Sequence, residues 1–463
     1  MVDSPEQAAV ALLRHVADTV PAYAAFLAGH GVDPADVTAL HDVPVTTKDN
    51  YVRRYPLAER CRDGTVGDMI AVSSGSTGEP TFWPRSPADE RAVADRFELI
   101  FRDAFRAHER RTLAVVCFAL GTWVGGLYTI GCLRQLAERG QPITIVAPGS
   151  DKGEILRVVT ALAPQFEQTV LLGYPPFLKD VIDTGKDVPW GEYDLKLVTA
   201  GEVFSEEWRS LVARRAGIDD PVRATASLYG TADAGVLGNE TPLSIEIRRL
   251  LSARPDAARE LFGESRLPTL VQYDPYARFF EEIDGTLAFT GDNGVPLVRY
   301  NIADEGGLVP YDRMMDFLGQ HGLTPKATEP RLPFVYVFGR SQFTVSFYGA
   351  NVYPENITVG LEQPGISEAV TGKFVLEVVE DAHHDRHLSV TVELAPDVTP
   401  DPALPNRVAE AVVTHLCRLN SEFAHYVPEH RRRPLIDLRP FADPKYFPPG
   451  VKHRYTRPDN SLP

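Results

Sequence analysis

The sequence predicts an α/β fold with a large N-terminal domain of doubly wound mixed sheets and a β-rich subdomain, followed by a small α+β C-terminal domain. Apolar strand-like runs alternate with helix-like stretches from about residue 68 to residue 240. This alternation is typical of a mostly parallel sheet covered by helices. From Thr269 onward, closely spaced strand patterns predict antiparallel pairing. A further strand-and-helix region follows Gly339, so we predict domains at residues 1–338 and 339–463.

The elements follow from the spacing of apolar residues. Helical spacing after Ser4-Pro5 predicts a helix over residues 4–30. Residues 43–48 predict a short extended element. The alternating region predicts strands at 68–72, 113–120, 142–146, 169–172 and 196–200, and helices at 89–107, within 121–140, and at 155–162 and 205–215. The sequence after residue 268 predicts strands at 271–273, 277–283, 285–290, 344–348, 374–379 and 387–394, and a helix at 405–423.

Composition excludes several classes of protein. The formal net charge of −16 disfavours binding to nucleic acid and to anionic membranes. No apolar run is long enough to cross a membrane, and the N-terminus lacks the basic and apolar regions of a signal peptide. The four cysteines form no CxxC pair, which argues against a disulfide framework or a zinc site. We therefore expect a cytoplasmic enzyme with reduced thiols and no nucleic-acid or membrane partner, with a homodimer as the commonest assembly.

A glycine- and hydroxyl-rich loop follows the predicted strand at 68–72. Glycines allow tight turns, and exposed backbone N–H groups in such a loop can bind an anion. The loop lacks the GK[ST] ending of a Walker A motif. The alternative is a flexible surface turn. The residues are Ser73, Ser74, Gly75, Ser76, Thr77 and Gly78.

Two later motifs combine aromatic and acidic residues. Tyr229, Gly230 and Thr231 precede Asp233, which suits a planar base stacked on the tyrosine and a carboxylate near a metal. The alternative is an ordinary turn with a solvated carboxylate. Asp304 ends an apolar strand and can accept both hydroxyls of a ribose. Alternatively, it forms a structural pair with Arg299.

Two basic motifs lie toward the C-terminus. Gly339-Arg340 lies at the predicted domain junction, where it could be a hinge and a phosphate contact or a plain turn. Lys452 lies in a loop rich in glycine and proline, from which it could reach a developing negative charge. The alternative is a solvated basic tail.

Together these motifs resemble the adenylate-forming superfamily of acyl-CoA synthetases, adenylation domains and luciferases. In detail they resemble its branch of phenylacetate–CoA ligases and coenzyme F390 synthetases, and the resemblance runs from about residue 40 to the end. Residues 73–81 resemble the SSGTTGKPT loop, 199–207 a GAEP-type adenine segment, 227–233 the YGxTE motif, 296–304 PLIRYRTGD, 339–354 GRSDDMxxxxGVNVFP, 118–131 the acyl-pocket segment, and 43–55 an N-terminal PxTTKxDLR element.

The resemblance implies ATP-dependent activation of a carboxylic acid, of aryl or arylacetic type, through an acyl-adenylate that is transferred to CoA. It implies that residues 73–78 bind phosphates, that Asp233 binds Mg²⁺, that Arg340 contacts the nucleotide, and that Lys452 is a catalytic lysine on a mobile C-terminal domain. It further implies that Gly201, Glu202, Tyr229, Gly230 and Thr231 line the nucleotide site with Asp304, and that Phe118, Gly121, Trp123, Gly125 and Tyr128 line the acyl pocket.

Several residues depart from the pattern of the superfamily. Glu79 replaces a lysine, Asp233 replaces a glutamate, and Gln342 stands where a hinge carboxylate is usual. These departures keep open another acyl acceptor, such as an amine or a carrier protein, adenylyl transfer of the F390 type, or a nucleotide-binding protein without catalysis. Lys445 is an alternative to Lys452, which lies one residue off the usual spacing.

Overall fold

The computed structural model describes residues 4–73, 81–263, 267–340, 345–396, 398–399 and 401–447. Contacts divide the chain into two compact units. The first comprises Met1–Val72, Phe82–Gly173 and Leu178–Gly339, and the second comprises Ser73–Thr81, Tyr174–Phe177 and Arg340–Pro463. This division follows contacts rather than sequence order, so the domain boundaries at residues 1–338 and 339–463 stay a prediction.

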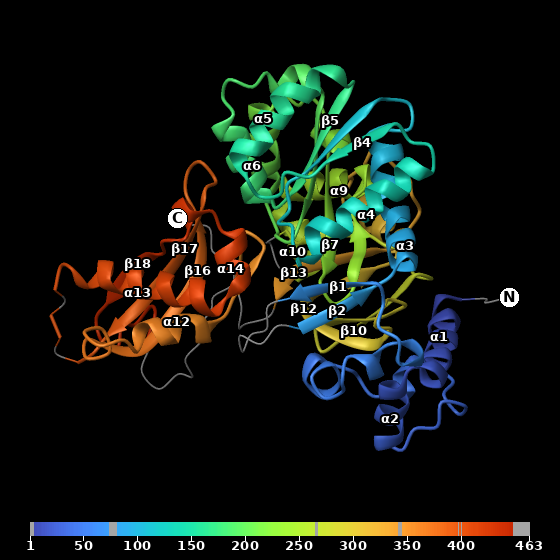
Figure 1. Ribbon diagram of the computed structural model, residues 1–463, viewed down its shortest axis with the longest axis horizontal. Helices are drawn as coiled ribbons and strands as arrows, with labels where there is room; N and C mark the ends of the chain where they lie inside the picture. Colours follow the sequence, from blue (N-terminus) through green and yellow to red (C-terminus); the bar gives the residue numbers. More distant parts are fainter. Residues whose placement is uncertain are drawn as a thin grey trace. The chain divides into compact units, whose positions relative to one another are not determined.

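The first unit is built on one mixed sheet of 11 described strands, in the order β10-β11-β12-β13-β9-β8-β7-β6-β5-β3-β4 (Figure 1). Five neighbours pair in parallel: β4 (Ile143–Val146), β3 (Thr112–Val116), β5 (Gln168–Gly173), β6 (Leu195–Ala200) and β7 (Thr225–Thr231). Every residue of β3 and of β5 is buried, as expected where helices cover both faces of a parallel sheet. The predicted α/β class is confirmed.

Antiparallel pairs continue the same sheet. The strands are β8 (Gly235–Asn239), β9 (Thr269–Gln272), β10 (Arg278–Ile283), β11 (Thr286–Gly291), β12 (Leu297–Val309) and β13 (Phe334–Arg340). β8 pairs antiparallel with β7 and β9, β9 with β13, and β11 with both β10 and β12. The parallel and antiparallel regions therefore share one sheet.

Crossover helices cover the parallel strands on both faces. The chain runs from β3 out to β4 and then back across β3 to β5, so right-handed crossovers place the first connecting helix opposite the later ones. Figure 1 shows α5 and α6 across the strands from α3 and α4. The helices are α3 (Pro87–Glu98), α4 (Val124–Glu138), α5 (Lys152–Leu162), α6 (Pro175–Thr184), α7 (Glu206–Arg215) and the short α8 (Pro221–Ala224).

The N-terminal segment forms two helices, α1 (Pro5–Thr19) and α2 (Pro21–Gly29), where one had been predicted. Val20 between them is extended, with φ −114° and ψ 105°. Pro21 explains the break, because proline disfavours the helical conformation in the residue before it. Both helices contribute to a buried cluster that also contains Phe289 and Tyr300.

α6, α8 and α12 (Pro354–Leu361) were not predicted. Nor were three further helices: α9 (Pro242–Ser252), α10 (Pro255–Phe262) and α11 (Tyr311–Gln320). Leu243, Phe262 and Met314 from these helices share a second buried cluster with Leu270 of β9 and Phe334 of β13. The Thr241 hydroxyl accepts a hydrogen bond from Ser244 N and caps α9. The three helices thus fill the space beside the antiparallel strands.

The second unit contains a small α+β arrangement. Strands β16 (Val370–Glu380) and β17 (Arg386–Leu394) pair antiparallel, and β17 pairs in parallel with β18 (Leu435–Arg439). A tight hairpin of β14 (Val345–Phe347) and β15 (Ala350–Val352) turns at Tyr348 and Gly349, which have φ of 53° and 83°. The helices are α12 (Pro354–Leu361), α13 (Leu404–Leu419) and α14 (Ser421–Tyr426). In the part of the chain that is described, no helix is both long and apolar enough to cross a membrane.

Candidate active site

The strands that flank the glycine- and hydroxyl-rich loop are β1 (Met69–Ser73) and β2 (Thr81–Arg85), which form a two-stranded sheet. Val72 N donates to Thr122 O at 2.9 Å, which joins β1 to the segment before α4. Ser73 is buried at the end of β1. Residues 74–78 lie outside the described residues, so phosphate binding by the loop stays a prediction.

Tyr229 and Asp304 come together although 75 residues separate them. The Tyr229 hydroxyl, from β7, donates to Asp304 Oδ2, from β12, at 2.8 Å, and both residues are buried. A hydrogen bond from a hydroxyl to a carboxylate is among the stronger kinds in proteins. The residue predicted for the adenine and the residue predicted for the ribose therefore share one location.

A second tyrosine holds the predicted metal-binding carboxylate. Tyr300 donates its hydroxyl to Asp233 Oδ2 at 2.6 Å, and Asp233 is 6% exposed. The turn that carries Asp233 is tight, because a Cβ on Gly230 would lie 2.5 Å from Gly235 O. Thr231 stabilises the same turn by accepting a hydrogen bond from Ala234 N at 3.1 Å.

Arg299 does not pair with Asp304, so that alternative is wrong. Its Nε lies 3.0 Å from both carboxylate oxygens of Glu281. Its carbonyl oxygen accepts from Thr46 N at 3.1 Å, and Thr46 O in turn accepts from Asn301 N at 2.9 Å. The predicted extended element near residue 46 thus contacts β12 on the N-terminal side of Asp304.

The adenine segment follows β6, where Gly201 has a φ of 88° and Glu202 is buried. Arg248 Nη2 donates to Phe204 O of this segment at 2.7 Å. Glu240 Oε2 accepts from Ser227 N of β7 at 2.9 Å, two residues before Tyr229. Arg248 and Glu240 therefore fix the backbone of both predicted adenine segments.

Arg248 and Glu240 belong to a buried group of four charged residues, here called the paired arginine cluster: Glu206, Arg209, Glu240 and Arg248. Arg209 lies 3.0 Å from Glu206 and 2.6 Å from Glu240, and Arg248 lies 2.9 Å from Glu206. Burial alone would lower the pKa of Arg209, but the two carboxylates raise it above its usual value. The cluster pairs two arginines with two glutamates, so its formal charges balance.

The predicted acyl-pocket residues surround the start of α4. Phe118, Trp123 and Tyr128 are all buried. Gly121 has a φ of 86°, which favours glycine, and a Cβ on Gly125 would lie 3.5 Å from the Phe118 ring. The structure places these five residues on one short segment, and their role in binding an acyl group stays a prediction.

Arg85 connects this segment to the Asp233 turn. Its guanidinium donates to the carbonyl oxygen of Ala232 and lies 5.7 Å from the centre of the Tyr128 ring. It also approaches Asp233 O at 3.4 Å. Arg85 is 1% exposed, and sequence reasoning missed it because a single arginine after a strand reads as solvated.

The predicted basic residues are only partly described. Arg340 ends β13, but its side chain lies outside the described part of the chain, and so does all of Lys452. Lys445 is described, and its Nζ lies 5.1 Å from the centre of the Tyr446 ring. The choice between Lys452 and Lys445 as the catalytic lysine stays open.

The side chains around Asp233 determine which kind of Mg²⁺ site could form there. Within the described ranges, no group of three or more metal-binding side chains lies together. Mg²⁺ is commonly bound by one or two carboxylates together with substrate phosphates and water. The single buried carboxylate of Asp233, oriented by Tyr300, fits such a site and does not fit a site made of protein ligands alone.

Comparisons with known proteins agree with this geometry. The chain is 23% identical over 406 residues to the phenylacetate-coenzyme A ligase of Escherichia coli strain K12. The alignment covers 82% of this chain and 80% of that ligase. A solved 2-hydroxyisobutyryl-CoA ligase, in complex with 2-HIB-AMP and CoA in the thioesterification state, aligns with a TM-score of 0.63 at 16% identity. That alignment covers 98% of this chain and 89% of the ligase. The chain has the fold of the adenylate-forming enzymes, and its sequence is similar to that of a phenylacetate–CoA ligase.

A second structure of that ligase, in an open conformation, aligns with a TM-score of 0.52 at 15% identity and covers 99% of this chain and 95% of the ligase. At these identities the solved structures establish the fold of the adenylate-forming enzyme. No protein-family model matches the chain.

Sequence reasoning missed four groups that the structure places at this site: Tyr300, Arg85, Glu240 and Arg248. Tyr300 lies within a quoted motif, and its position one residue after Arg299 gave no reason to single it out. Glu240 and Arg248 follow the Tyr229 motif by 11 and 19 positions. Acidic and basic residues at such spacing usually lie on solvated helix faces, so only the fold reveals that they pair inside.

Proposed function

We propose that this chain is an adenylate-forming enzyme that activates a carboxylic acid of aryl or arylacetic type with ATP and transfers the acyl group to CoA. The observation that carries the proposal is the 2.8 Å hydrogen bond between Tyr229 and Asp304, which joins a base-stacking ring to a carboxylate suited to ribose hydroxyls. Buried aromatic residues at the start of α4 support an acyl pocket that accepts aromatic groups.

In the first step, an oxygen of the substrate carboxylate attacks the α-phosphorus of ATP, the bond to the β-phosphate oxygen breaks, and pyrophosphate leaves. Asp233 would hold Mg²⁺, which offsets phosphate charge when it is bound. In our proposal, Ser73 and residues 74–78 bind the phosphates, and Lys452 approaches the reacting oxygens together with Arg340. In the second step, the CoA thiolate attacks the acyl carbon and AMP leaves.

One observation favours an acyl acceptor other than CoA: Gln342 stands where the superfamily has a hinge carboxylate. An amine or a carrier-protein thiol would then replace CoA in the second step, while the first step stays the same. The two candidates differ only in what consumes the acyl-adenylate.

The test is pyrophosphate release across a panel of carboxylic acids that includes benzoic, phenylacetic and short aliphatic acids, with and without CoA. We expect release that depends on the acid, and AMP release that rises with CoA. Lys452→Ala should slow pyrophosphate release by about 10²–10³-fold, because the lysine acts on charge that develops in the transition state. Lys445→Ala is the matched control and should leave the rate near that of the wild type.

The outcomes separate the candidates. No acid-dependent pyrophosphate release from any acid would reject adenylation altogether. Release that is unaffected by CoA, with acyl-adenylate accumulating on the enzyme, would reject CoA as the acceptor. If Lys445→Ala is the slow variant, the catalytic lysine is Lys445.

A cytoplasmic location is also part of the proposal. Cys61, Cys117, Cys132 and Cys417 are all free thiols, which supports a reducing compartment.

A further inference from the structure

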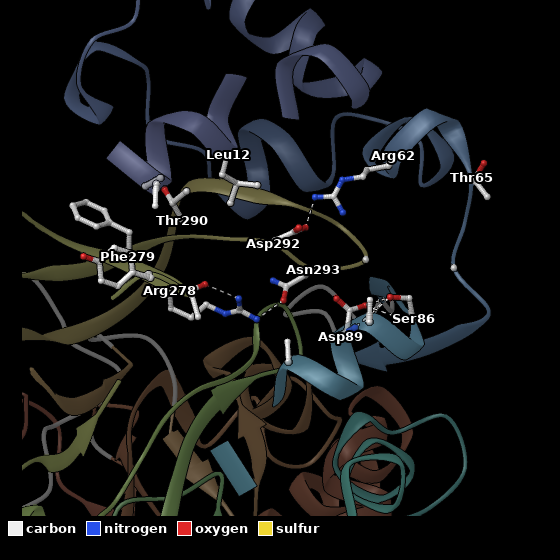
Figure 2. Close-up of a pocket in the computed structure, with 18 residues that line it drawn as sticks. Leu12, Arg62, Thr65, Ser86, Asp89, Arg278, Phe279, Thr290, Asp292 and Asn293 are labelled. Atoms are coloured by element: carbon white, nitrogen blue, oxygen red, sulfur yellow. Dashed lines mark hydrogen bonds and ion pairs between the residues drawn. The ribbon is translucent and has the colours of Figure 1, made fainter. Parts of the chain in front are cut away.

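A cavity of about 480 Å³ lies away from the residues predicted for nucleotide and acyl binding. Its walls come from α1, the start of α3, and strands β10 and β11 with the turn that follows β11 (Figure 2). Small-molecule sites in proteins commonly have volumes of ~300–1,000 Å³. Apolar side chains from α1 and α3 line part of this lateral cavity: Ala8, Ala9, Leu12, Ala88 and Ala92.

The cavity is also lined by a buried arginine that forms no direct ion pair with a carboxylate of the described residues. Arg278 is 7% exposed and donates only to Ala277 O at 2.8 Å and to Asn293 Oδ1 at 2.7 Å. Figure 2 shows its guanidinium extending toward Asn293. Arg278 Nε and Asn293 Nδ2 are both buried without a hydrogen-bond partner in the described part of the chain. Two residues that line the cavity therefore each keep an unsatisfied N–H donor.

The carboxylates of the cavity are engaged elsewhere. Asp292 pairs with Arg62, and Asp89 accepts from Ser86 N at 2.7 Å and from the Ser86 hydroxyl at 3.0 Å. Burial lowers the pKa of Arg278, and the nearby positive charge of Arg85 lowers it too. Tyr128, Asp89 and Asp292 act in the opposite direction and raise it. Asp89 and Asp292 therefore act on Arg278 without forming a direct ion pair with it among the described residues.

We infer that the lateral cavity binds a small monocarboxylate with an apolar tail. The carboxylate would pair directly with the guanidinium of Arg278, and its oxygens would accept from the side chains of Arg278 and Asn293. The apolar tail would contact the alanine and leucine side chains that α1 and α3 contribute to the cavity. Buried charges in proteins are normally paired, and a carboxylate suits the planar donor edge of a guanidinium.

The site would be separate from the acyl pocket but connected to it. Asp89 lines the cavity, and its carbonyl oxygen accepts the hydroxyl of Tyr128, a predicted acyl-pocket residue, at 3.1 Å. A bound acid would therefore lie next to Asp89, which contacts a residue predicted for the acyl pocket. This inference extends beyond the proposed reaction, because it assigns a second acid to a second place.

The test is isothermal titration of the full-length chain with butyrate, hexanoate and benzoate, in the presence of a saturating acyl-sulfamoyl adenosine that occupies the nucleotide and acyl sites. Butyramide, hexanamide and benzamide are the neutral counterparts, and inorganic phosphate is the anion without a tail. We expect saturable binding of at least one acid, and binding of its amide and of phosphate weaker by about tenfold or more.

Three variants locate the binding. Arg278→Met removes the charge, and Ala92→Phe fills the apolar side from an exposed position without touching Arg278, so it should fold even if the first variant does not. Both should weaken acid binding by about tenfold or more. Ala25→Phe is the matched control, because Ala25 is exposed on α2 outside the cavity lining, and it should bind the acid as the wild type does.

Each contrary result overturns the inference. Absence of saturable binding by all three acids rejects the site, and equal binding of acid and amide rejects the charge argument. Phosphate binding tighter than any acid rejects the monocarboxylate class. Unchanged binding in Ala92→Phe places the acid elsewhere. Failure of the adenosine compound to bind would instead count against the proposed function, and the variants would still report on the lateral cavity.

Discussion

Arg209 lies between the carboxylates of Glu206 and Glu240, near the predicted adenine segment. Arg278, in contrast, lines the lateral cavity and has only a carbonyl oxygen and an amide oxygen as acceptors among the described residues. Both guanidinium groups are buried in the first unit of the chain. Burial lowers the pKa of Arg278, while Glu206 and Glu240 overcome the same effect of burial on the pKa of Arg209 and raise it. An arginine with complete ionic partners indicates a structural role, and one without them indicates a missing partner.

The paired arginine cluster also explains how the adenine segments stay aligned. A buried ion pair costs several kcal/mol in desolvation, so its retention needs a reason other than stability alone. Here Arg248 holds Phe204 O, which follows β6, and Glu240 holds Ser227 N, which lies in the neighbouring strand β7. The cluster therefore fixes the spacing of the two segments that would enclose a nucleotide base.

The largest effect is expected from Glu240→Leu. This change leaves Arg209 and Arg248 short of one negative charge and leaves Ser227 N–H without its acceptor. Removal of one partner from a buried ion pair typically lowers the free energy of unfolding by ~3–5 kcal/mol. Urea unfolding followed by tryptophan fluorescence measures it, because Trp83, Trp123, Trp190 and Trp208 all lie in the first unit.

Glu240→Gln is the control, since it keeps an oxygen for Ser227 N–H and loses only the charge. Its loss should fall between those of the wild type and Glu240→Leu. A cost of less than about 1 kcal/mol for Glu240→Leu, the size of an exposed ion pair, would contradict the view that the cluster is fully desolvated.

A smaller effect with a defined pH dependence is expected from Glu206→Gln. Burial alone would raise the pKa of Glu206, but Arg209 and Arg248 hold it below its ordinary value of 4.5. The charged form therefore stabilises the fold above pH 4.5, and this contribution disappears as the pH falls through the lower folded-state value. We expect Glu206→Gln to cost ~1.5–3 kcal/mol at pH 7, and the difference from wild type to shrink below pH 4.5.

Urea unfolding at a series of pH values measures this difference. A gap between Glu206→Gln and wild type that stays constant from pH 7 to the acid limit of folding would show that the carboxylate charge is not what stabilises the cluster.

Arg248→Met tests whether the cluster positions the nucleotide site. Loss of the hydrogen bond to Phe204 O should loosen the adenine segment and raise KM for ATP by about tenfold, equivalent to ~1.4 kcal/mol, with a smaller change in kcat. Leu251→Ala is the matched control, because Leu251 also lies on α9 but packs into the cluster of Leu243 and Phe262. It should lower stability and leave KM for ATP unchanged. An equal rise of KM in both variants would reduce the cluster to a structural role.

The sequence predicted the parts of this molecule that depend on local pattern. Among the parallel strands, β3, β4, β5 and β6 were predicted from their apolar runs, whereas β7 was not, because its residues Tyr229 to Thr231 fitted a turn. α7 was found because Ser205 caps a helix of regular spacing. Tyr229, Asp233 and Asp304 were found through motifs. The pairs that orient them were not, because Tyr300 and Asp233 are 67 residues apart and meet only once β12 joins the sheet.

The buried charges could not be predicted for a related reason. Glu206, Arg209 and Arg248 lie on helices that read as solvated, since buried charges are rare unless partners from distant segments meet them. The break at Pro21 was predictable from backbone chemistry alone, and its omission was an error of interpretation.

The smallest effect on stability is expected from Arg278→Met. Methionine fills similar space without a charge, so the desolvation cost disappears, while Ala277 O and Asn293 Oδ1 each lose a donor. Replacement of a buried charge by an apolar side chain is often neutral, and we expect a change within about 1 kcal/mol in urea unfolding. The matched change Arg209→Met should lower the free energy of unfolding by ~3–5 kcal/mol, because it removes the arginine that pairs with both Glu206 and Glu240. A loss of that size in Arg278→Met would mean that its charge is already balanced within the folded chain, and the lateral cavity would then have no missing partner to bind.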